Sequence, residues 1–130
     1  MKDILLSIII PVYNAEMHLD RTLKQLCNQI EKRSFFDVKL IVLDDASTDS
    51  STSIIAKYKD KRFVETFSFI ERVSTGKVRN IGLDLACQLS SEYVAFCDSD
   101  DLLDIGIARN MALNLKQDKC PLGMAYYQKK

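Results

Sequence analysis

Three carboxylates follow a short apolar run in the second half of the chain. Residues 93–97 read as a buried strand, and Asp98, Asp100 and Asp101 come directly after it. Carboxylates this close repel one another unless a cation neutralises them, and oxygen-only ligands favour Mg²⁺ or Mn²⁺ over zinc. Loops at the carboxyl ends of strands are where open α/β sheets bind ligands. The stretch predicts a divalent metal site at which the metal ion binds a phosphate ester.

Three other stretches should meet the acidic stretch along one edge of a sheet. Tyr13 follows the first apolar run, and the polar loop 44–49 follows the second. The segment 76–80 opens a helix, whose N-terminal N–H groups suit phosphate, and Arg79 adds positive charge. An aromatic ring, carboxylates, a helix N-terminus and basic side chains form the complement expected for a nucleoside diphosphate with a metal ion.

Each feature also has a purely structural interpretation. The pair Asp44 and Asp45 could cap the next helix, and Tyr13 could be a core aromatic with its hydroxyl at the rim. Lys77 and Arg79 could be solvated surface charges, and the acidic stretch could be a turn with a helix cap. The occurrence of all of these features at successive strand ends favours a ligand site.

Hydrophobic patterning predicts the elements that position these loops. Nearly continuous β-branched runs are typical of strands buried on both faces, and apolar stripes at helical spacing indicate helices. The expected strands cover 4–12, 38–43, 64–70, 93–97 and 123–128, and the expected helices cover 17–33, 51–58, 78–89 and 105–115. This alternation predicts an α/β protein with a three-layer α/β/α, Rossmann-like arrangement and a mostly parallel sheet.

Composition narrows the class of protein. The 130 residues fit a single domain spanning 1–130, and 47% apolar with 28% charged residues is ordinary for a soluble chain. Eighteen basic residues balance eighteen acidic ones, which argues against nucleic acid as a partner. The apolar opening run lacks a signal-peptide cleavage site and is too short to span a bilayer. The cysteines form no Cys-x-x-Cys pair, so we expect reduced core residues in a cytoplasmic protein. These are Cys27, Cys87, Cys97 and Cys120.

Four sequence blocks carry a resemblance to a known family. They span residues 7–14, 42–50, 76–86 and 96–101, in the order and spacing that the family shows. The chain resembles the family 2 inverting glycosyltransferases of the GT-A fold. The resemblance implies a nucleotide-diphospho-sugar donor, most often a UDP-sugar, a Mn²⁺ or Mg²⁺ cofactor and a saccharide or lipid-linked saccharide acceptor. It also implies a role in cell-surface polysaccharide synthesis, in the cytoplasm with peripheral association at the inner face of the membrane.

The resemblance also implies roles for particular residues. Asp100 would bind the metal directly, and Asp98 would contact the ribose or a metal-bound water. Either Asp44 or Asp45 would bind the base or the ribose. The whole set implied to bind the nucleotide-sugar is Pro11, Val12, Tyr13, Asp44, Asp45, Gly76, Arg79, Asn80, Asp98 and Ser99, with Asp98 and Asp100 as the metal ligands.

The sequence departs from the family pattern in two ways. Ala46 stands where many members have glycine, and because alanine adopts positive φ only at a cost, that loop is expected to bend differently. Members also continue well beyond this length, and neither Asp104 nor Asp118 has a motif expected of a general base. We therefore expect this chain to be the donor-binding half, with the base outside it. The alternative is a non-catalytic nucleotide-sugar-binding fragment completed by a missing half or a partner chain.

A third interpretation comes from the same acidic stretch. Residues 96–101 also resemble the Asp-x-Asp start of haloacid dehalogenase-type phosphohydrolases. In those enzymes the second aspartate is followed, one residue on, by threonine or valine, whereas here Leu102 occupies that position. Their motif also follows the first strand rather than the fourth, as does the acidic pair of receiver domains. Both classes are therefore disfavoured.

Overall fold

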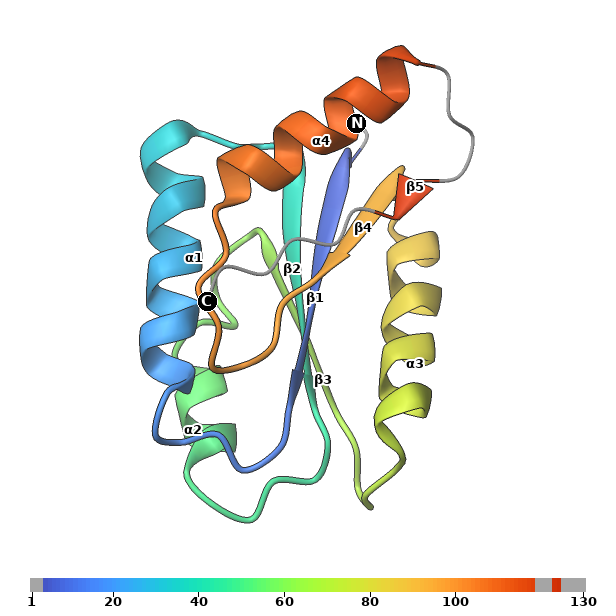
Figure 1. Ribbon diagram of the computed structural model, residues 1–130. Helices are drawn as coiled ribbons and strands as arrows, with labels where there is room; N and C mark the ends of the chain where they lie inside the picture. Colours follow the sequence, from blue (N-terminus) through green and yellow to red (C-terminus); the bar gives the residue numbers. More distant parts are fainter. Residues whose placement is uncertain (1–3, 119–122, 125–130) are drawn as a thin grey trace.

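Strands and helices alternate along the chain in the computed structural model, which describes residues 4–118 and 123–124 (Figure 1). The strands are β1 (Leu6–Val12), β2 (Val38–Asp44), β3 (Val64–Ser68), β4 (Tyr93–Phe96) and β5 (Gly123–Met124), and the helices are α1 (Leu19–Arg33), α2 (Ser51–Ala56), α3 (Thr75–Gln88) and α4 (Ile105–Gln117). The predicted order is confirmed. β3 ends two residues before the expected position 70, and α4 runs two residues beyond 115. Residues 125–128 of the expected last strand lie outside the described residues.

The sheet is parallel throughout and has the order β3-β2-β1-β4-β5. β1 lies between β2 and β4, and its Ile8, Ile9 and Ile10 are completely buried, as the β-branched run predicts. The chain therefore leaves β1 toward β2 and β3 on one side and returns to β4 on the other. Ligands bind outside the carboxyl ends of strands at such a switch point.

Helices cover both faces of the sheet and bury two separate apolar clusters. α1, α2 and α4 pack on one face around residues such as Leu23, Ile55 and Ile105, and α3 covers the other face through Val78 and Ala86 (Figure 1). Ser7 interrupts the apolar run of β1, and its buried hydroxyl is hydrogen-bonded to that of Ser91. The α/β fold with helices on both faces is the one that the sequence predicts.

The cysteines are only partly as predicted. Cys27 and Cys97 are free and buried, and burial raises the pKa of the Cys27 thiol to about 11. Cys87 is free but exposed, so the expectation of a core position is wrong for this residue. It lies in α3, of which only one side packs on the sheet. Cys120 lies outside the described residues.

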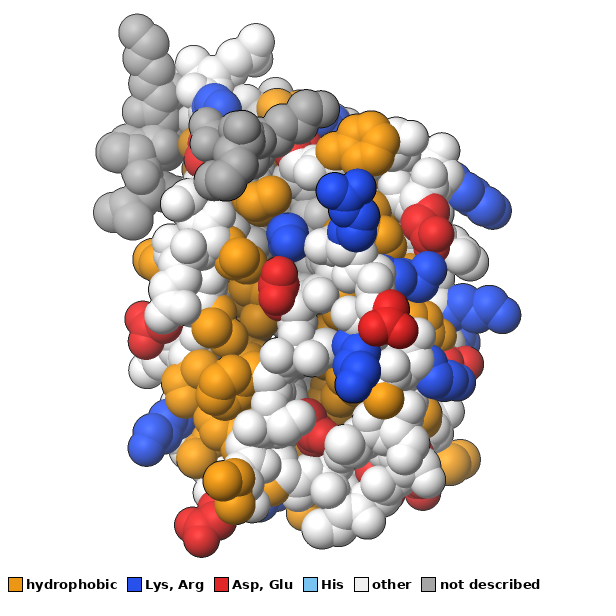
Figure 2. All heavy atoms as spheres, turned by 180° about the vertical axis from the view of Figure 1, so that it is seen from behind, with side chains coloured by type: hydrophobic (Ala, Val, Ile, Leu, Met, Phe, Trp, Pro, Cys, Tyr) orange, Lys and Arg blue, Asp and Glu red, His pale blue; other side chains and the backbone are white. Residues whose placement is uncertain are grey.

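Surface charge is mixed in sign. On the face seen in Figure 2, basic side chains lie among acidic ones, and the described residues form no uninterrupted basic surface there. None of the helices within residues 4–118 is long and apolar enough to cross a bilayer.

Gly82 lets α3 approach the sheet closely. A Cβ built at this position would lie 2.6 Å from Cγ2 of Ile9 and 2.9 Å from Cδ1 of Leu43. Glycine inside a helix costs roughly 1 kcal/mol relative to alanine, so close packing explains its presence. We expect Gly82→Ala to lower the free energy of unfolding by about 1–3 kcal/mol through overpacking, measured by urea denaturation.

Gly76→Ala is the matched control for that substitution. Gly76 lies in the first turn of the same helix, and a Cβ there meets nothing within 4 Å. This variant should keep the wild-type stability or gain slightly. Equal stability of both variants would contradict the close-packing role of Gly82.

Candidate functional site

The predicted residues gather at the carboxyl ends of β1, β2 and β4. Tyr13 follows β1, Asp45 follows β2 and Asp98 follows β4 by one intervening residue. The pairing of β1 with β2 continues one step beyond the strands, because the Asp45 N–H donates to the Val12 carbonyl at 2.8 Å. α3 begins at the same end of the sheet and adds its first turn (Figure 1).

A cavity of about 170 Å³ lies between these segments. Tyr13 forms one wall and is 42% exposed, and Asp45 is 4% exposed. The full lining consists of Pro11, Val12, Tyr13, Asp45, Arg72, Thr75 and Val78. Four of these seven come from the set implied by the sequence resemblance.

Arg72 connects the two walls of this cavity. Its Nε donates to Oδ2 of Asp45 at 3.0 Å, and its guanidinium carbon lies 3.4 Å from the centre of the Tyr13 ring. The Val73 N–H donates to the other oxygen of Asp45 at 2.9 Å. The Asp45 carboxylate therefore anchors the segment before α3 through two hydrogen bonds. The remaining N–H groups of Arg72 lie beside the Tyr13 ring.

Asp44 has a different environment from its neighbour. Its Oδ1 accepts from the Ser47 N–H at 3.1 Å, and its Oδ2 accepts from the Thr52 hydroxyl at 2.6 Å. Both carboxylate oxygens thus stabilise the loop and the start of α2, as the capping interpretation of this residue supposes. The structure brings Asp45, rather than Asp44, to the cavity.

The acidic cluster consists of Asp98, Asp100 and Asp101. One carboxylate oxygen from each of them lies within 4.8 Å of the other two. Burial and the neighbouring Asp101 raise the pKa of Asp98, and Arg79, whose Nη2 lies 3.6 Å from an Asp98 oxygen, offsets this only in part. Burial and the neighbouring aspartates thus destabilise the ionised form of Asp98 more than Arg79 stabilises it. An oxygen-only set of this kind fits Mg²⁺ or Mn²⁺.

Cys97 is the thiol next to the acidic cluster. Burial, with the surrounding aspartates, raises its pKa to about 12. The group of residues whose potential ligand atoms all lie within 4.8 Å of one another consists of Asp98, Asp100 and Asp101, without Cys97. The donor set that the described residues offer here is therefore one of carboxylate oxygen atoms.

A glutamine on α1 fixes the segment that follows the cluster. Gln29 donates from Nε2 to the Leu103 carbonyl at 2.8 Å and accepts from the Ile105 N–H at 2.8 Å. Asp104 then caps α4, accepting from the Ile107 N–H at 3.1 Å. Asp104 thus has a structural role, which agrees with its lack of a general-base motif.

Ala46 departs from its predicted conformation. The loop was expected to avoid positive φ at this alanine, yet Ala46 has φ of 56°. The expectation is wrong because contacts on either side hold the turn: Asp44 accepts from the Ser47 N–H, and the Asp45 N–H is bonded to Val12. The loop thus tolerates a conformation that glycine would adopt without strain.

This strain predicts the effect of a glycine. We expect Ala46→Gly to raise the free energy of unfolding by about 1 kcal/mol, because the left-handed region costs an L-residue roughly that much. Ala15→Gly is the control, since Ala15 lies in the neighbouring loop and does not have a positive φ. Urea denaturation of the two variants measures the difference, and a loss of stability in Ala46→Gly would contradict the assignment of strain.

The remaining predicted residues lie around the cavity rather than in its lining. Gly76 and Asn80 are exposed on the first turns of α3, and Ser99 is half-buried in the turn between the aspartates. Arg79 lies between the two parts of the site, since it contacts Asp98 and directly follows Val78 of the cavity. The sequence reasoning missed Arg72, Thr75 and Val78. The signal for Thr75 and Val78 was their place in the first turn of the helix, whereas Arg72 lies in an irregular segment.

A larger cavity than the one beside Tyr13 lies elsewhere in the described part of the chain. It measures about 940 Å³ and is bounded by the end of α1, the start of β2 and the turn before β3. Its Lys39 and Lys61 are already paired with Glu65 and Glu31. It lies at the amino ends of the strands, away from the switch point, so the smaller cavity is the candidate site.

The parallel sheet, the switch point beside β1 and the acidic cluster after β4 define the chain as a GT-A-type α/β protein. The chain belongs to glycosyl transferase family 2, whose model matches residues 7–127. An uncharacterised glycosyltransferase of Haemophilus influenzae is 42% identical over 101 residues, covering 76% of this chain and 37% of that protein. The poly(ribitol-phosphate) beta-N-acetylglucosaminyltransferase TarS of Staphylococcus aureus is 37% identical over 100 residues, covering 75% of this chain and 16% of TarS.

Solved structures agree with this assignment. The crystal structure of S. aureus TarS residues 1–349 with UDP has a TM-score of 0.73 at 29% identity, covering 88% of this chain and 32% of that one. A mannosyltransferase of Pyrobaculum calidifontis with GDP-Man and Mn²⁺ has a TM-score of 0.67 at 22% identity, covering 90% of this chain and 32% of that one, and supports the fold alone. This chain therefore spans about a third or less of the length of these structures.

Proposed function

We propose that this chain is the nucleotide-sugar-binding part of a family 2 glycosyltransferase, and that it takes a UDP-sugar as donor. The observation that carries the proposal is the pairing of the Tyr13–Asp45–Arg72 cavity with the acidic cluster across the first turn of α3. TarS, at 29% identity, has been crystallised with UDP and with UDP-GlcNAc. The site offers a place for each part of such a donor.

The base occupies the cavity. The Tyr13 ring provides an apolar wall, and the Asp45 carboxylate accepts from the N3–H of a uracil. Arg72 donates to a base carbonyl oxygen from the N–H groups that Asp45 leaves unused. An acceptor carboxylate beside a guanidinium donor matches the alternating donors and acceptors on the edge of uracil.

The diphosphate lies between α3 and the acidic cluster. The N–H groups of the first turn of α3 and the Arg79 guanidinium stabilise the phosphate oxygens. Asp100 and Asp98 would hold Mn²⁺ or Mg²⁺, which would supply positive charge to offset that of a departing diphosphate. Arg79 gives up its contact with Asp98 as the donor binds, because both phosphate and carboxylate compete for one guanidinium.

Transfer then proceeds by a single displacement with inversion. An acceptor hydroxyl, deprotonated by a general base, attacks the anomeric carbon, and the bond to the diphosphate breaks. We assign the base and the acceptor site to regions outside the matched stretch, since the relatives are much longer than this chain. The acceptor is a saccharide or lipid-linked saccharide of a cell-surface polysaccharide, and the protein acts in the cytoplasm at the inner face of the membrane.

A thermal-shift screen tests donor and metal together. UDP and UDP-sugars with Mn²⁺ should raise the melting temperature, whereas GDP with Mn²⁺ or UDP with a chelator should have a much smaller effect. Equal shifts for UDP and GDP, or none with any nucleotide, would count against the proposal.

The second candidate function is non-catalytic binding of a nucleotide-sugar. It is favoured by the helix-capping roles of the two acids that follow the cluster. Asp104 accepts from the Ile107 N–H at the start of α4, and Asp118 lies at the end of the same helix, so neither is a candidate for the general base. Release of UDP from UDP-sugars by this chain, with and without an oligosaccharide acceptor, separates the two functions. Turnover by the chain alone would exclude the binding-only candidate.

A further inference from the structure

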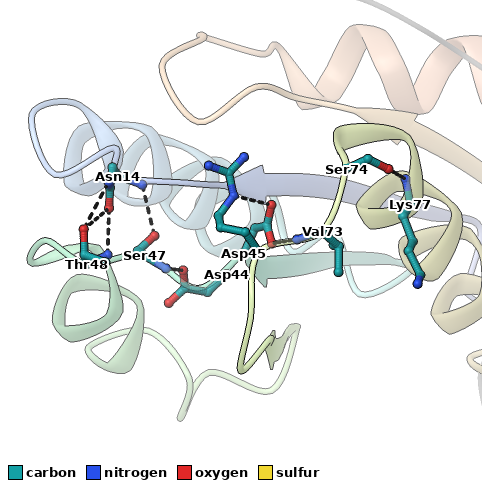
Figure 3. A network of polar contacts seen from close by, with 9 residues as sticks. Asn14, Asp44, Asp45, Ser47, Thr48, Val73, Ser74 and Lys77 are labelled. Carbon is teal, nitrogen blue, oxygen red and sulfur yellow. Dashed lines mark hydrogen bonds and ion pairs between the residues drawn. The ribbon is translucent and has the colours of Figure 1, made fainter.

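Asn14 lies at the junction of the two loops that form the base cavity. It directly follows Tyr13 and has φ of 46°, a conformation that asparagine tolerates better than most residues. Its side chain points toward the loop after β2 (Figure 3). This orientation brings its amide to the backbone that follows Asp45.

The Asn14 amide cross-links the loops through several hydrogen bonds. Its Oδ1 accepts from the Thr48 N–H at 2.8 Å and from the Asp49 N–H at 3.3 Å, and its Nδ2 donates to Oγ1 of Thr48 at 3.3 Å. The Asn14 backbone N–H also donates to Oγ of Ser47 at 3.0 Å. One residue therefore bonds to three consecutive residues of the opposite loop.

These bonds act where apolar packing is scarce. Tyr13 and Asn14 are exposed, and Ala46 holds a strained φ in the facing loop. Between the strand ends and Asn14, only the Asp45–Val12 backbone bond joins the described segments of the two loops. Ordering the backbone of a free residue costs conformational entropy, so loops that were loose before binding would lower ligand affinity.

We propose that Asn14 is a positioning residue for the nucleotide base: its cross-link holds the Tyr13 ring and the Asp45 carboxylate at their binding separation before the ligand arrives. Asn14 acts through the loop backbone and need not touch the base. The inference rests on the proposed function, since it assigns the base to the Tyr13–Asp45 cavity.

Two substitutions separate the cross-link from the backbone conformation. Asn14→Gly keeps positive φ without strain and removes the amide. Asn14→Asp tolerates the same φ and keeps an acceptor oxygen for the two N–H groups and the Thr48 hydroxyl. Glu16→Ala is the control, because Glu16 accepts from the Ser50 N–H at 3.0 Å and thus joins the same loops farther from Tyr13.

Calorimetric titration of UDP in the presence of Mn²⁺ gives the first readout. Asn14→Gly should weaken UDP binding by about tenfold, the cost of ordering roughly one further residue. Asn14→Asp and Glu16→Ala should stay within about threefold of wild type, a change of well under 1 kcal/mol. A loss of stability in Asn14→Gly without a change in UDP affinity would mean a structural role only and would overturn the inference.

Amide hydrogen exchange of the ligand-free proteins gives the second readout. Asn14→Gly should speed exchange at the Asp45 and Ala15 N–H groups, which are bonded to Val12 and Ser51, without affecting the core of β1. Unchanged exchange would overturn preordering by Asn14. If wild-type protein does not bind UDP, the proposed function fails and this inference with it, whereas equal UDP binding by wild type and Asn14→Gly removes the inference alone.

Discussion

Replacing Asp100 with asparagine is expected to weaken Mn²⁺-dependent UDP binding by about 100-fold or more. Asp100 is the exposed member of the acidic cluster, and the substitution removes one carboxylate with almost no change in shape. Even groups that only support a metal ligand cost roughly 10- to 100-fold when altered, so a direct ligand should cost at least as much. Calorimetry should give the variant the same UDP affinity with Mn²⁺ as the wild type has without it.

Asp84→Asn is the matched control for the loss of one negative charge. Asp84 is an exposed acid on α3, outside the cavity and the cluster. Both variants should unfold at the wild-type urea concentration, because neither side chain is buried. Retention of Mn²⁺-dependent UDP affinity in Asp100→Asn would refute the metal assignment.

Replacing Asp45 with asparagine should weaken UDP binding by about 10- to 100-fold, the range for losing a hydrogen bond to a charged group. The asparagine amide can face the base N3–H with a donor where an acceptor is needed, and it cannot pair with Arg72 as the carboxylate does. Binding should be measured by calorimetry on folded protein, with Mn²⁺ present. Mn²⁺ affinity without nucleotide should be much less affected, because Asp45 is not part of the acidic cluster.

Asp44→Asn gives the contrasting result. It disturbs the bonds to Ser47 and Thr52, so it should lower the free energy of unfolding by about 1 kcal/mol. UDP affinity of the folded variant should remain within about threefold of wild type. The opposite pattern, with Asp44→Asn losing UDP and Asp45→Asn retaining it, would reverse the assignment of the two aspartates.

The convergence of the predicted residues at one end of the sheet follows from the sequence, because parallel strands all have their carboxyl ends at the same edge. Buried β-branched runs such as that of β1 must lie in the interior of the sheet, and their carboxyl ends then bring Tyr13, Asp45 and the acidic stretch to one end. The three-layer fold was predictable for the same reason. The ends of the strands and helices were less predictable, as the ends of β3 and α4 show.

The roles of Asp44 and Asp45 depend on which helix covers which face. Ile41 and Leu43 pack toward α3, so the two-residue period of β2 directs Asp45 to the same side. Leu40 and Val42 pack toward α1 and α2, which directs Asp44 to Thr52. The two-residue period shows that Asp44 and Asp45 point to opposite faces of the sheet. Only the tertiary structure shows which of these faces is covered by α3.

Arg72 was beyond prediction for a different reason. It lies between β3 and α3 in a segment without periodicity, and its position depends on the bonds from Arg72 and Val73 to Asp45. The positive φ of Ala46 was also unpredictable from residue type, since neighbouring contacts outweigh its local preference. Long-range contacts fix both features.

A crystal structure of this chain grown with UDP and Mn²⁺, with anomalous scattering to locate the manganese, tests the central claim most directly. The account predicts one manganese peak about 2 Å from an Asp100 oxygen, with the diphosphate beside it and the uracil in the cavity lined by Tyr13, Asp45 and Arg72. A manganese peak away from residues 98–101, or UDP bound in the cavity between Phe36 and Arg62 at the opposite end of the sheet, would contradict it.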